Sequence, residues 1–347
     1  MKIAILGGGV AAFEAANTAR KVSADAEITI YSAESMLPYR RPALSGMLAD
    51  FKINEKMFFI KPESFYAENN ITVKLNTRCV EIKENALVMA DGSIAAFDRL
   101  IIATGGKACL PTIPGSDRDN VYTFRDVADL EKLDKVLTDT RQAVIVGAGV
   151  LGLELAESML KRNIKVTVLE MAPRLFSRFL SEEQSDEVGA KLKDFTDLHF
   201  EFNATATGIT DEGVTLADTR TIPADIVIFA AGSRPSLPEK MPESLKVNRG
   251  ILVNSTMQSS IPGIYAAGDA IEFEGKCFGL YNDARTTGIV AGSNALMTRI
   301  IVIQSSMQRS VRELKIFRVR TTGLFTSNGV RTFLMILSLI MLKKGSA

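Results

Sequence analysis

The sequence predicts an α/β protein built from two nested, doubly wound parallel sheets, with a shortened C-terminal segment after them. Two observations predict this fold. Residues 2–16 read KIAILGGGVAAFEAA, an apolar strand that runs into a glycine-rich turn and a helix, and residues 143–156 repeat the arrangement as AVIVGAGVLGLELA. Each copy is followed by a second apolar strand with an acidic residue near its end, as in a dinucleotide-binding βαβ unit.

Length and composition indicate a multidomain globular protein. The 347 residues are too many for one ordinary core, and 46% of them are hydrophobic and 23% charged. The formal net charge of +1 gives no indication of a nucleic-acid partner. Cys79, Cys109 and Cys277 lie far apart, which predicts free thiols in a reducing, cytoplasmic setting and no metal site. The first predicted strand begins at Lys2, which leaves no room for a secretory signal.

The first glycine-rich turn contains Gly7 and Gly9, and Ala12 occupies the position of the third glycine. Glycines allow the backbone to approach a pyrophosphate, whose charge is met by free N–H groups and by the positive end of the helix dipole. Because such turns also occur without a ligand, one copy alone is weak evidence. Two copies in one chain indicate two dinucleotide sites.

The second copy contains Gly147, Gly149 and Gly152, and Glu170 ends the next strand, 23 residues after Gly147. This spacing is typical of a carboxylate that binds a ribose 2′-hydroxyl. Since the same carboxylate repels a 2′-phosphate, the sequence favours NADH over NADPH. The alternative interpretation of Glu170 is a solvated residue at a strand end.

After the first copy the strand reads EITIYSAES, so Ser32 and Ala33 stand where an acid often occurs and Glu34 follows slightly late. We assign Glu34 to the ribose of the first dinucleotide. A solvated strand end is the alternative here as well.

In three further segments an apolar strand is followed by small residues: DRLIIATGGKACLPTIPG at 98–115, ADIVIFAAGSRPSLP at 224–238 and SSIPGIYAAGDA at 259–270. In the last segment Gly268 and Asp269 follow the strand directly. An acid at the carboxyl end of a strand in an open α/β sheet lies on the ligand-binding edge.

In this order GGGVAA, ATGG, GAGVLGLELA, AAGSRP and IYAAGDA resemble the FAD and NAD(P)H-dependent pyridine nucleotide oxidoreductases. The resemblance covers roughly residues 1–300. Two segments are most similar to the NADH:rubredoxin and ferredoxin reductases: MLPYRRPALS at 36–45 and RGILVNSTMQSSIPGIYAAGDAIEFEGK at 249–276. The second most similar group is the amino-terminal part of NADH-dependent nitrite reductases.

The resemblance implies two Rossmann-like domains with FAD in the first and NADH in the second. The FAD-binding domain is expected at 1–112 and 236–300, and the NAD-binding domain at 113–235. Residues 301–347 correspond to a truncated C-terminal interface segment.

The resemblance also implies roles for individual residues. On the FAD side the matching positions are Gly7, Gly9, Ala12, Arg41, Pro42, Ala103, Thr104, Gly105 and Asp269. Glu34 and Gly268 are further candidates for binding this cofactor. A helix is expected to begin near Leu280 and Tyr281, with its amino end directed at the flavin pyrimidine ring, where the dipole stabilises anionic reduced flavin.

On the NAD side the matching positions are Gly147, Gly149, Gly152 and Glu170. Glu154 matches a glutamate near the nicotinamide, and the catalytic positions implied are Glu154 and Arg41. For Glu154 the alternative is a solvated acid favoured by the dipole of the helix.

The sequence departs from the family pattern close to the predicted flavin. Ser45 and Gly46 stand where some relatives carry a redox-active cysteine, so we expect electrons to leave the flavin without a thiol relay. Several ferredoxin-reductase relatives have a lysine at the position of Gly46, paired with the glutamate that Glu154 matches. The one histidine, His199, is remote from every motif and is interpreted as structural.

The C-terminal segment is unusual in length and charge. Relatives continue into a third domain of roughly 100 residues, whereas about 47 remain here, and residues 299–347 carry a formal charge of about +8. The apolar run FLMILSLIML at 333–342 is too short for a membrane-spanning helix, and we favour packing against protein over an interfacial anchor. The basic surplus suggests steering of an acidic partner.

The sequence therefore predicts an enzyme that takes hydride from NADH onto FAD and passes single electrons to a small acidic carrier, a rubredoxin or a ferredoxin. Two enzymatic alternatives are an NADH oxidase or diaphorase and a nitrite-reductase-like flavin module. A non-enzymatic alternative is a regulatory module that binds NADH and FAD. We expect a monomer or a homodimer and no nucleic-acid partner.

Overall fold

The computed structural model describes residues 1–50, 55–177 and 180–296, which fall into two compact units. The first unit contains residues 1–43, 55–107 and 233–296 of this range, and the second contains residues 44–50, 108–177 and 180–232. Each unit is described by itself. The expected C-terminal interface segment at 301–347, including the apolar run at 333–342, lies outside the described residues.

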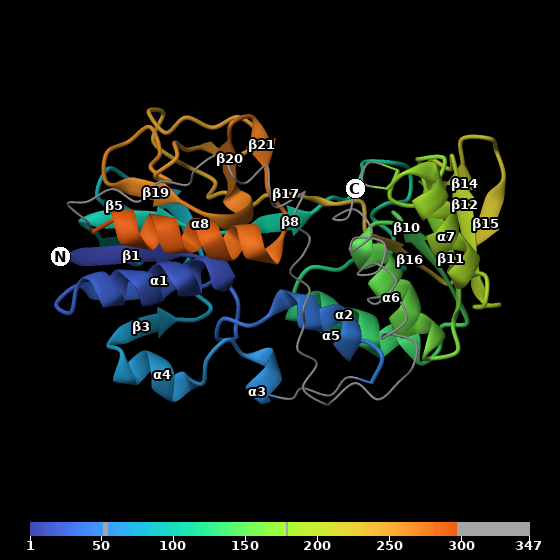
Figure 1. Cartoon of the computed structure of the whole chain (residues 1–347), viewed down its shortest axis with the longest axis horizontal. Coiled ribbons are helices and arrows are strands. Elements are labelled where there is room, and N and C mark those ends of the chain that lie inside the picture. The colour runs from blue at the N-terminus through green and yellow to red at the C-terminus, as the bar shows by residue number, and fades with distance from the viewer. Residues whose placement is uncertain (51–54, 178–179, 297–347) are drawn as a thin grey trace. The chain divides into compact units, whose positions relative to one another are not determined.

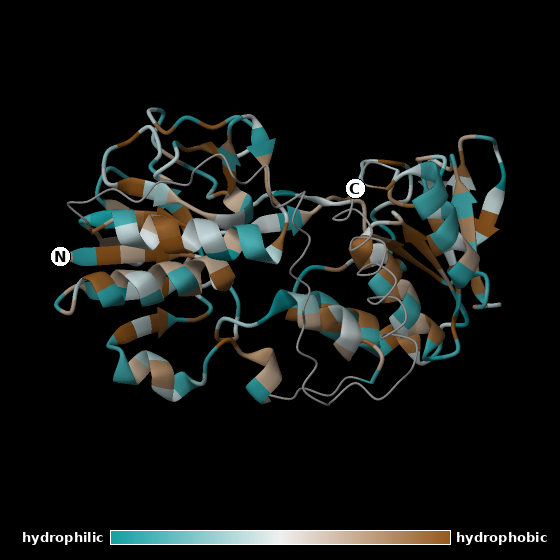
Figure 2. Cartoon of the chain, viewed as in Figure 1, coloured by the Kyte–Doolittle hydropathy of each residue, from teal (hydrophilic) through white to brown (hydrophobic). Residues whose placement is uncertain are grey.

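The first unit is centred on a five-stranded parallel sheet with the order β19-β7-β1-β2-β3 (Figure 1). Its strands are β1 (Lys2–Leu6), β2 (Glu27–Tyr31), β3 (Ile71–Lys74), β7 (Arg99–Ile102) and β19 (Ile264–Ala266). All residues of β1 after Lys2 are buried, as expected for a strand covered on both faces. In Figure 2 most of β1 is accordingly coloured as apolar.

Two helices of the first unit, α1 (Val10–Val22) and α8 (Tyr281–Asn294), lie side by side although more than half of the chain separates them (Figure 1). A methyl group on Gly288 would lie 2.4 Å from the carbonyl oxygen of Ala11, and one on Gly292 would lie 2.3 Å from that of Ala15. Small residues on both helices thus allow the two backbones to touch. This contact fixes the amino end of α8 beside the first glycine turn.

The remaining elements of the first unit are short. They are α3 (Glu55–Phe58), α4 (Glu63–Glu68), the antiparallel strands β4 (Cys79–Ile82), β5 (Ala86–Met89) and β6 (Ile94–Ala96), the paired strands β8 (Gly106–Ala108) and β17 (Ser233–Pro235), and the sheet of β18 (Ile251–Leu252), β20 (Ile271–Phe273) and β21 (Lys276–Cys277). Single 3₁₀ turns cover Arg41–Ala43 and Gly268–Ala270.

The second unit repeats this plan with a five-stranded parallel sheet of order β12-β11-β10-β16-β9. Its elements are α2 (Leu44–Met47), β9 (Val121–Thr123), α5 (Val127–Leu137), β10 (Gln142–Val146), α6 (Val150–Leu160), β11 (Lys165–Glu170), α7 (Glu182–Leu192), β12 (Leu198–Phe202), the antiparallel strands β13 (Ala206–Ile209), β14 (Gly213–Leu216) and β15 (Thr221–Pro223), and β16 (Ile226–Phe229).

The antiparallel strands cover one face of the parallel sheet in the second unit. Val214 and Leu216 of β14 pack with Val144 of β10 and with Val227 and Phe229 of β16, and all five side chains are at most 2% exposed. In the sequence, the antiparallel strands β4–β6 lie between β3 and β7 of the first unit, and β13–β15 lie between β12 and β16 of the second. The predicted pair of doubly wound parallel sheets is therefore present.

Candidate dinucleotide sites

The first glycine turn connects β1 to α1. The Gly7 N–H donates to the carbonyl oxygen of Tyr31 at 2.8 Å, and Gly7 has a φ of +118°, where a methyl group would lie 2.1 Å from the carbonyl oxygen of Ala103. In the described part of the chain, a methyl group on Gly9 would meet no atom within 4 Å. Ala12 is fully buried in the first turn of α1. The chain thus needs Gly7 for its own packing, whereas the space before Gly9 is open to a ligand.

The loop after β7 lies at the same edge of the sheet. Ala103 is buried and follows β7 directly, and Gly105 has a φ of +70°. Between them, the Thr104 hydroxyl is buried and has no hydrogen-bond partner among the described residues. Since an unpaired buried hydroxyl costs free energy, it fits a polar ligand bound at this edge.

The loop after β19 completes this edge of the sheet. The Gly268 N–H donates to the Thr287 hydroxyl at 2.9 Å, and Asp269 is 9% exposed. Asp283, in the first turn of α8, has a pKa raised by burial and then by the negative charge of Asp269. Two carboxyl groups therefore lie near the start of α8.

Helix α8 begins where the sequence predicted. Leu280 is its extended N-cap residue and is 59% exposed, and Tyr281 is half-buried. Burial raises the pKa of the Tyr281 hydroxyl. The free N–H groups at this end are directed out of the helix, as an anionic group requires.

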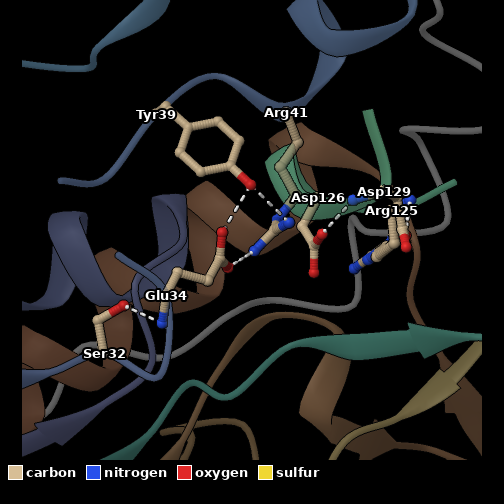
Figure 3. A network of polar contacts seen from close by, with 7 residues as sticks. All are labelled: Ser32, Glu34, Tyr39, Arg41, Arg125, Asp126 and Asp129. Atoms are coloured by element: carbon tan, nitrogen blue, oxygen red, sulfur yellow. Dashed lines mark hydrogen bonds and ion pairs between the residues drawn. The ribbon is translucent and has the colours of Figure 1, made fainter. Parts of the chain in front are cut away.

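Glu34 forms a compact polar group with Tyr39 and Arg41 (Figure 3). Its carboxylate accepts a hydrogen bond from the Tyr39 hydroxyl at 2.6 Å and forms an ion pair with Arg41, whose guanidinium also donates to Tyr39 at 3.0 Å. The Glu34 N–H donates to the Ser32 hydroxyl. Glu34 thus holds Arg41 in place, a contact that the sequence did not predict. Pro42 follows Arg41 in the 3₁₀ turn.

The second glycine turn connects β10 to α6 with nearly the same geometry. The Gly147 N–H donates to the carbonyl oxygen of Leu169 at 2.8 Å, and its φ is +116°. A methyl group on Gly149 would meet no atom of the described residues within 4 Å, whereas one on Gly152 would lie 2.0 Å from the carbonyl oxygen of Gly147. Gly152 thus allows α6 to pack against the turn, and Gly149 leaves space before it.

Glu170 lies beside this turn at the end of β11. Its carboxylate accepts hydrogen bonds from the backbone N–H groups of Ala148 at 3.0 Å and Ala172 at 2.8 Å. These bonds hold an acceptor at the edge of the turn, and each carboxylate oxygen has further lone pairs for a ligand hydroxyl.

The acid of the first unit lies further from its turn in the sequence than Glu170 does. The hydrogen bond from Gly7 to Tyr31 corresponds to the one from Gly147 to Leu169. The residue after Tyr31 is Ser32 and the residue after Leu169 is Glu170, so these two positions are equivalent. Ser32 is fully buried, and a methyl group on Gly8 would lie 2.3 Å from its hydroxyl oxygen. Ser32 thus packs against the turn, and the first acid follows two residues later as Glu34.

Glu154 lies on α6 in a small hydrogen-bond network. The buried Ser45 hydroxyl donates to its carboxylate at 2.8 Å, and the buried Ser158 hydroxyl donates to the backbone carbonyl of Ser45 at 2.6 Å. Burial raises the Glu154 pKa, the Ser45 hydroxyl lowers it, and the charge of Glu157 raises it. Glu154 is therefore not a solvated acid of the first helical turn.

The contact with α6 places residues 44–50 in the second unit, although the sequence analysis included them in the first domain. Sequence reasoning identified Ser45 as the substitute for a cysteine and missed its contact with Glu154, and it did not single out Ser158. Only the packing of α2 against α6 brings these residues together, because more than 100 residues separate Ser45 from Glu154.

The sequence also contains one histidine and three cysteines. His199 is an exposed residue of β12, and the three cysteines are free and partly buried. Within the described ranges, no group of histidine, cysteine, aspartate and glutamate could hold a metal ion. Within the same ranges, every helix is too short or too polar to cross a membrane.

Comparison with known proteins gives consistent results. The family model described as pyridine nucleotide-disulphide oxidoreductase matches residues 1–295. A rubredoxin-NAD(+) reductase from Pseudomonas putida is 34% identical over 84% of this chain and 80% of its own length. A nitrite reductase [NAD(P)H] from Bacillus subtilis is 33% identical over 80% of this chain and 35% of its own.

Solved structures of similar fold include electron-transfer reductases. A ferredoxin reductase from Rhodopseudomonas palustris has a TM-score of 0.80 and 26% identity over 87% of this chain and 78% of its own. An NADH:rubredoxin oxidoreductase from Clostridium acetobutylicum has a TM-score of 0.73 and 30% identity over 88% of this chain and 78% of its own. These similarities confirm the fold class predicted from the sequence.

Proposed function

Because the chain belongs to the pyridine nucleotide-disulphide oxidoreductase family, as its motifs predicted, we propose that it is an FAD-dependent NADH oxidoreductase that supplies electrons to a small redox protein. The carrier is a rubredoxin or a ferredoxin. In the overall reaction one NADH and two oxidised carriers give NAD⁺, one proton and two reduced carriers. Bound FAD supplies the conversion between a two-electron donor and one-electron acceptors.

The observation that supports this proposal is the pair of glycine turns with open space before Gly9 and Gly149. A dinucleotide pyrophosphate bound at each turn accepts hydrogen bonds from the free N–H groups of α1 and α6. The Thr104 hydroxyl, which has no protein partner in the described part of the chain, offers a hydrogen bond to the first ligand. FAD is assigned to the first unit and NADH to the second.

The remaining cofactor contacts are assigned from position. In the first unit the contacts belong to Gly7, Ala12, Glu34, Arg41, Ala103, Gly105, Gly268, Asp269, Leu280 and Tyr281. In the second unit they belong to Gly147, Gly152 and Glu170. Arg41 is held by Glu34 and Tyr39 and would supply a positive charge near the flavin. Glu154 would orient the nicotinamide. A cytoplasmic setting and the oligomeric state stay predictions from the sequence.

The first test is an anaerobic titration with NADH that follows the visible flavin band, followed by addition of oxidised rubredoxin. We expect NADH to bleach the flavin and rubredoxin to restore it within one turnover. Bleaching without recovery on rubredoxin would show that another acceptor is used, and fast recovery on oxygen alone would indicate an NADH oxidase. A protein that binds both cofactors without bleaching would be a binding module, contrary to our proposal.

Replacing Glu170 by arginine is expected to lower the preference for NADH over NADPH about tenfold or more, because arginine binds a 2′-phosphate that a carboxylate repels. The ratio of kcat/KM for the two nucleotides measures this change. Glu182→Arg at an exposed position of α7 makes the same change of charge and is expected to leave the ratio unaltered. An unchanged ratio in Glu170→Arg would show that Glu170 does not bind the ribose.

Replacing Ser45 by alanine is expected to shift the pH dependence of flavin reduction by NADH to higher pH. The Ser45 hydroxyl stabilises ionised Glu154, so its loss raises the Glu154 pKa further. Rapid-mixing measurements of flavin bleaching as a function of pH give the inflection. Ser185→Ala also removes a buried hydroxyl of the second unit, but one that donates to Leu175, and serves as the control. Equal profiles for Ser45→Ala and the control would contradict a role for Ser45.

A further inference from the structure

The turn that follows β19 leaves the parallel sheet of the first unit at Gly268. The Ala267 N–H still donates to the carbonyl oxygen of Ile102 at 2.9 Å and continues the ladder between β19 and β7. Gly268 comes next and is buried, so its N–H needs a partner outside the sheet. That partner is the Thr287 hydroxyl on α8, at 2.9 Å. A side chain 19 residues further along the chain therefore holds the start of this turn.

The hydroxyl of Thr287 is held in one orientation. The side chain is fully buried, and its oxygen lies 2.8 Å from the carbonyl oxygen of Asp283 and 3.1 Å from that of Ala284, one turn earlier in α8. A threonine in a helix can donate to a carbonyl three or four residues before it. Since the hydroxyl proton is used inside the helix, a lone pair of the oxygen is left to accept the Gly268 N–H.

The same turn is held at its other end. The Ile271 N–H donates to the carbonyl oxygen of Gly268 and closes the 3₁₀ turn Gly268–Ala270. Gly268 is thus fixed through both its N–H and its carbonyl, and Asp269, which is 9% exposed, follows it directly. Burial raises the pKa of Asp283, and the charge of Asp269 raises it further. The carboxyl group of Asp269 therefore lies near the first turn of α8.

Packing places this turn between the two long helices of the first unit. A methyl group on Gly268 would lie 3.0 Å from the β-carbon of Ala11 in α1 and 3.6 Å from that of Ala284 in α8. Ala11 is the second residue after Gly9, so the turn lies beside the glycine turn to which we assign the FAD pyrophosphate. Because the Thr287 side chain is fully buried, it acts on this site through the turn and not by contact with a ligand.

We propose that Thr287 is a positioning residue of the FAD site, whose hydroxyl fixes the turn Gly268–Ala270 and so holds Asp269 in its binding orientation. The inference rests on the proposed function, which assigns Asp269 to FAD. Without the hydroxyl, the Gly268 N–H is left buried and unpaired, and the turn has to move to satisfy it. A cofactor binds more tightly to a group that is already held in place. Loss of the hydroxyl is therefore expected to weaken FAD retention.

The test compares Thr287→Val with Thr286→Val in the full chain. Valine replaces the hydroxyl by a methyl group of similar size. Thr286 is the next residue, is exposed, and donates to the carbonyl oxygen of Asn282 at 2.9 Å, so it makes the same bond within the helix. Release of FAD from the purified holoprotein is followed by the rise in FAD fluorescence. We expect release about tenfold faster in Thr287→Val, and within about twofold of the unaltered protein in Thr286→Val.

Two further variants separate positioning from packing. Thr287→Ser keeps the hydroxyl and loses a methyl group, and it is expected to release FAD within about threefold of the unaltered protein. If Thr287 acts through Asp269, the two substitutions are not additive. The double variant Thr287→Val with Asp269→Asn is then expected to release FAD within about twofold of Asp269→Asn alone.

Three results would overturn the role of Thr287 while the reductase function stands. They are equal release rates in Thr287→Val and Thr286→Val, release from Thr287→Ser as fast as from Thr287→Val, and fully additive effects in the double variant. Far-UV circular dichroism checks that each variant is folded. If the unaltered protein binds no FAD, the proposed function fails together with this inference.

Discussion

Replacing Gly149 by alanine is expected to weaken NADH binding at least tenfold while the fold and FAD binding remain intact. A methyl group at Gly149 meets no atom of the described residues within 4 Å, so this part of the protein accommodates it without NADH. That methyl group occupies the space through which a pyrophosphate approaches the turn and the N–H groups of α6. Binding is measured as the concentration of NADH needed for half-maximal flavin bleaching under anaerobic conditions.

Two related variants distinguish loss of ligand contact from loss of structure. Gly152→Ala places a methyl group 2.0 Å from the carbonyl oxygen of Gly147 and is expected to lower the melting temperature as well as NADH affinity. Gly9→Ala is the counterpart of Gly149→Ala in the first unit and is expected to weaken FAD retention instead. Unchanged NADH affinity in Gly149→Ala would place the pyrophosphate elsewhere.

Replacing Arg20 by alanine is expected to lower the free energy of unfolding by about 3 kcal/mol. The guanidinium lies between the end of α1 and the turn from α4 to β3. It donates to five backbone carbonyls, those of Ser23, Ala24, Ala26, Asn69 and Asn70. These bonds join three segments of the first unit, and alanine leaves all five carbonyls without this partner. Chemical denaturation followed by far-UV circular dichroism measures the loss.

The planar guanidinium is essential to this expectation, because its fixed donors match carbonyls on both sides. Arg20→Lys keeps the charge but has one ammonium, so it is expected to recover less than half of the loss. Arg78→Ala is the control, since that side chain is 61% exposed and, among the described residues, pairs only with Glu239 at the surface. Equal stability of Arg20→Ala and Arg78→Ala would show that the five bonds contribute little.

Local sequence predicted the parts of the candidate sites that depend on short-range geometry. A glycine turn is defined within a few residues, because the backbone conformation at Gly7 and Gly147 excludes other side chains. The start of α8 was predicted near Leu280 and Tyr281 and lies there, and Glu170 lies beside its turn, since the spacing from Gly147 follows from one helix and one strand. The relation of Glu34 to Arg41 was missed, because charge pairing across a loop leaves no periodic signal in the sequence.

By itself the sequence determined that this protein has two parallel sheets, each with a glycine turn at the end of its first strand, because apolar strands and helices of regular spacing encode that topology locally. The tertiary structure alone decided which distant residues share an environment. It brought Ser45 to Glu154, joined α1 to α8 through Gly288 and Gly292, and brought the Thr287 hydroxyl to the Gly268 N–H. Such contacts depend on how helices and loops pack on the sheet, and packing is a property of the whole chain.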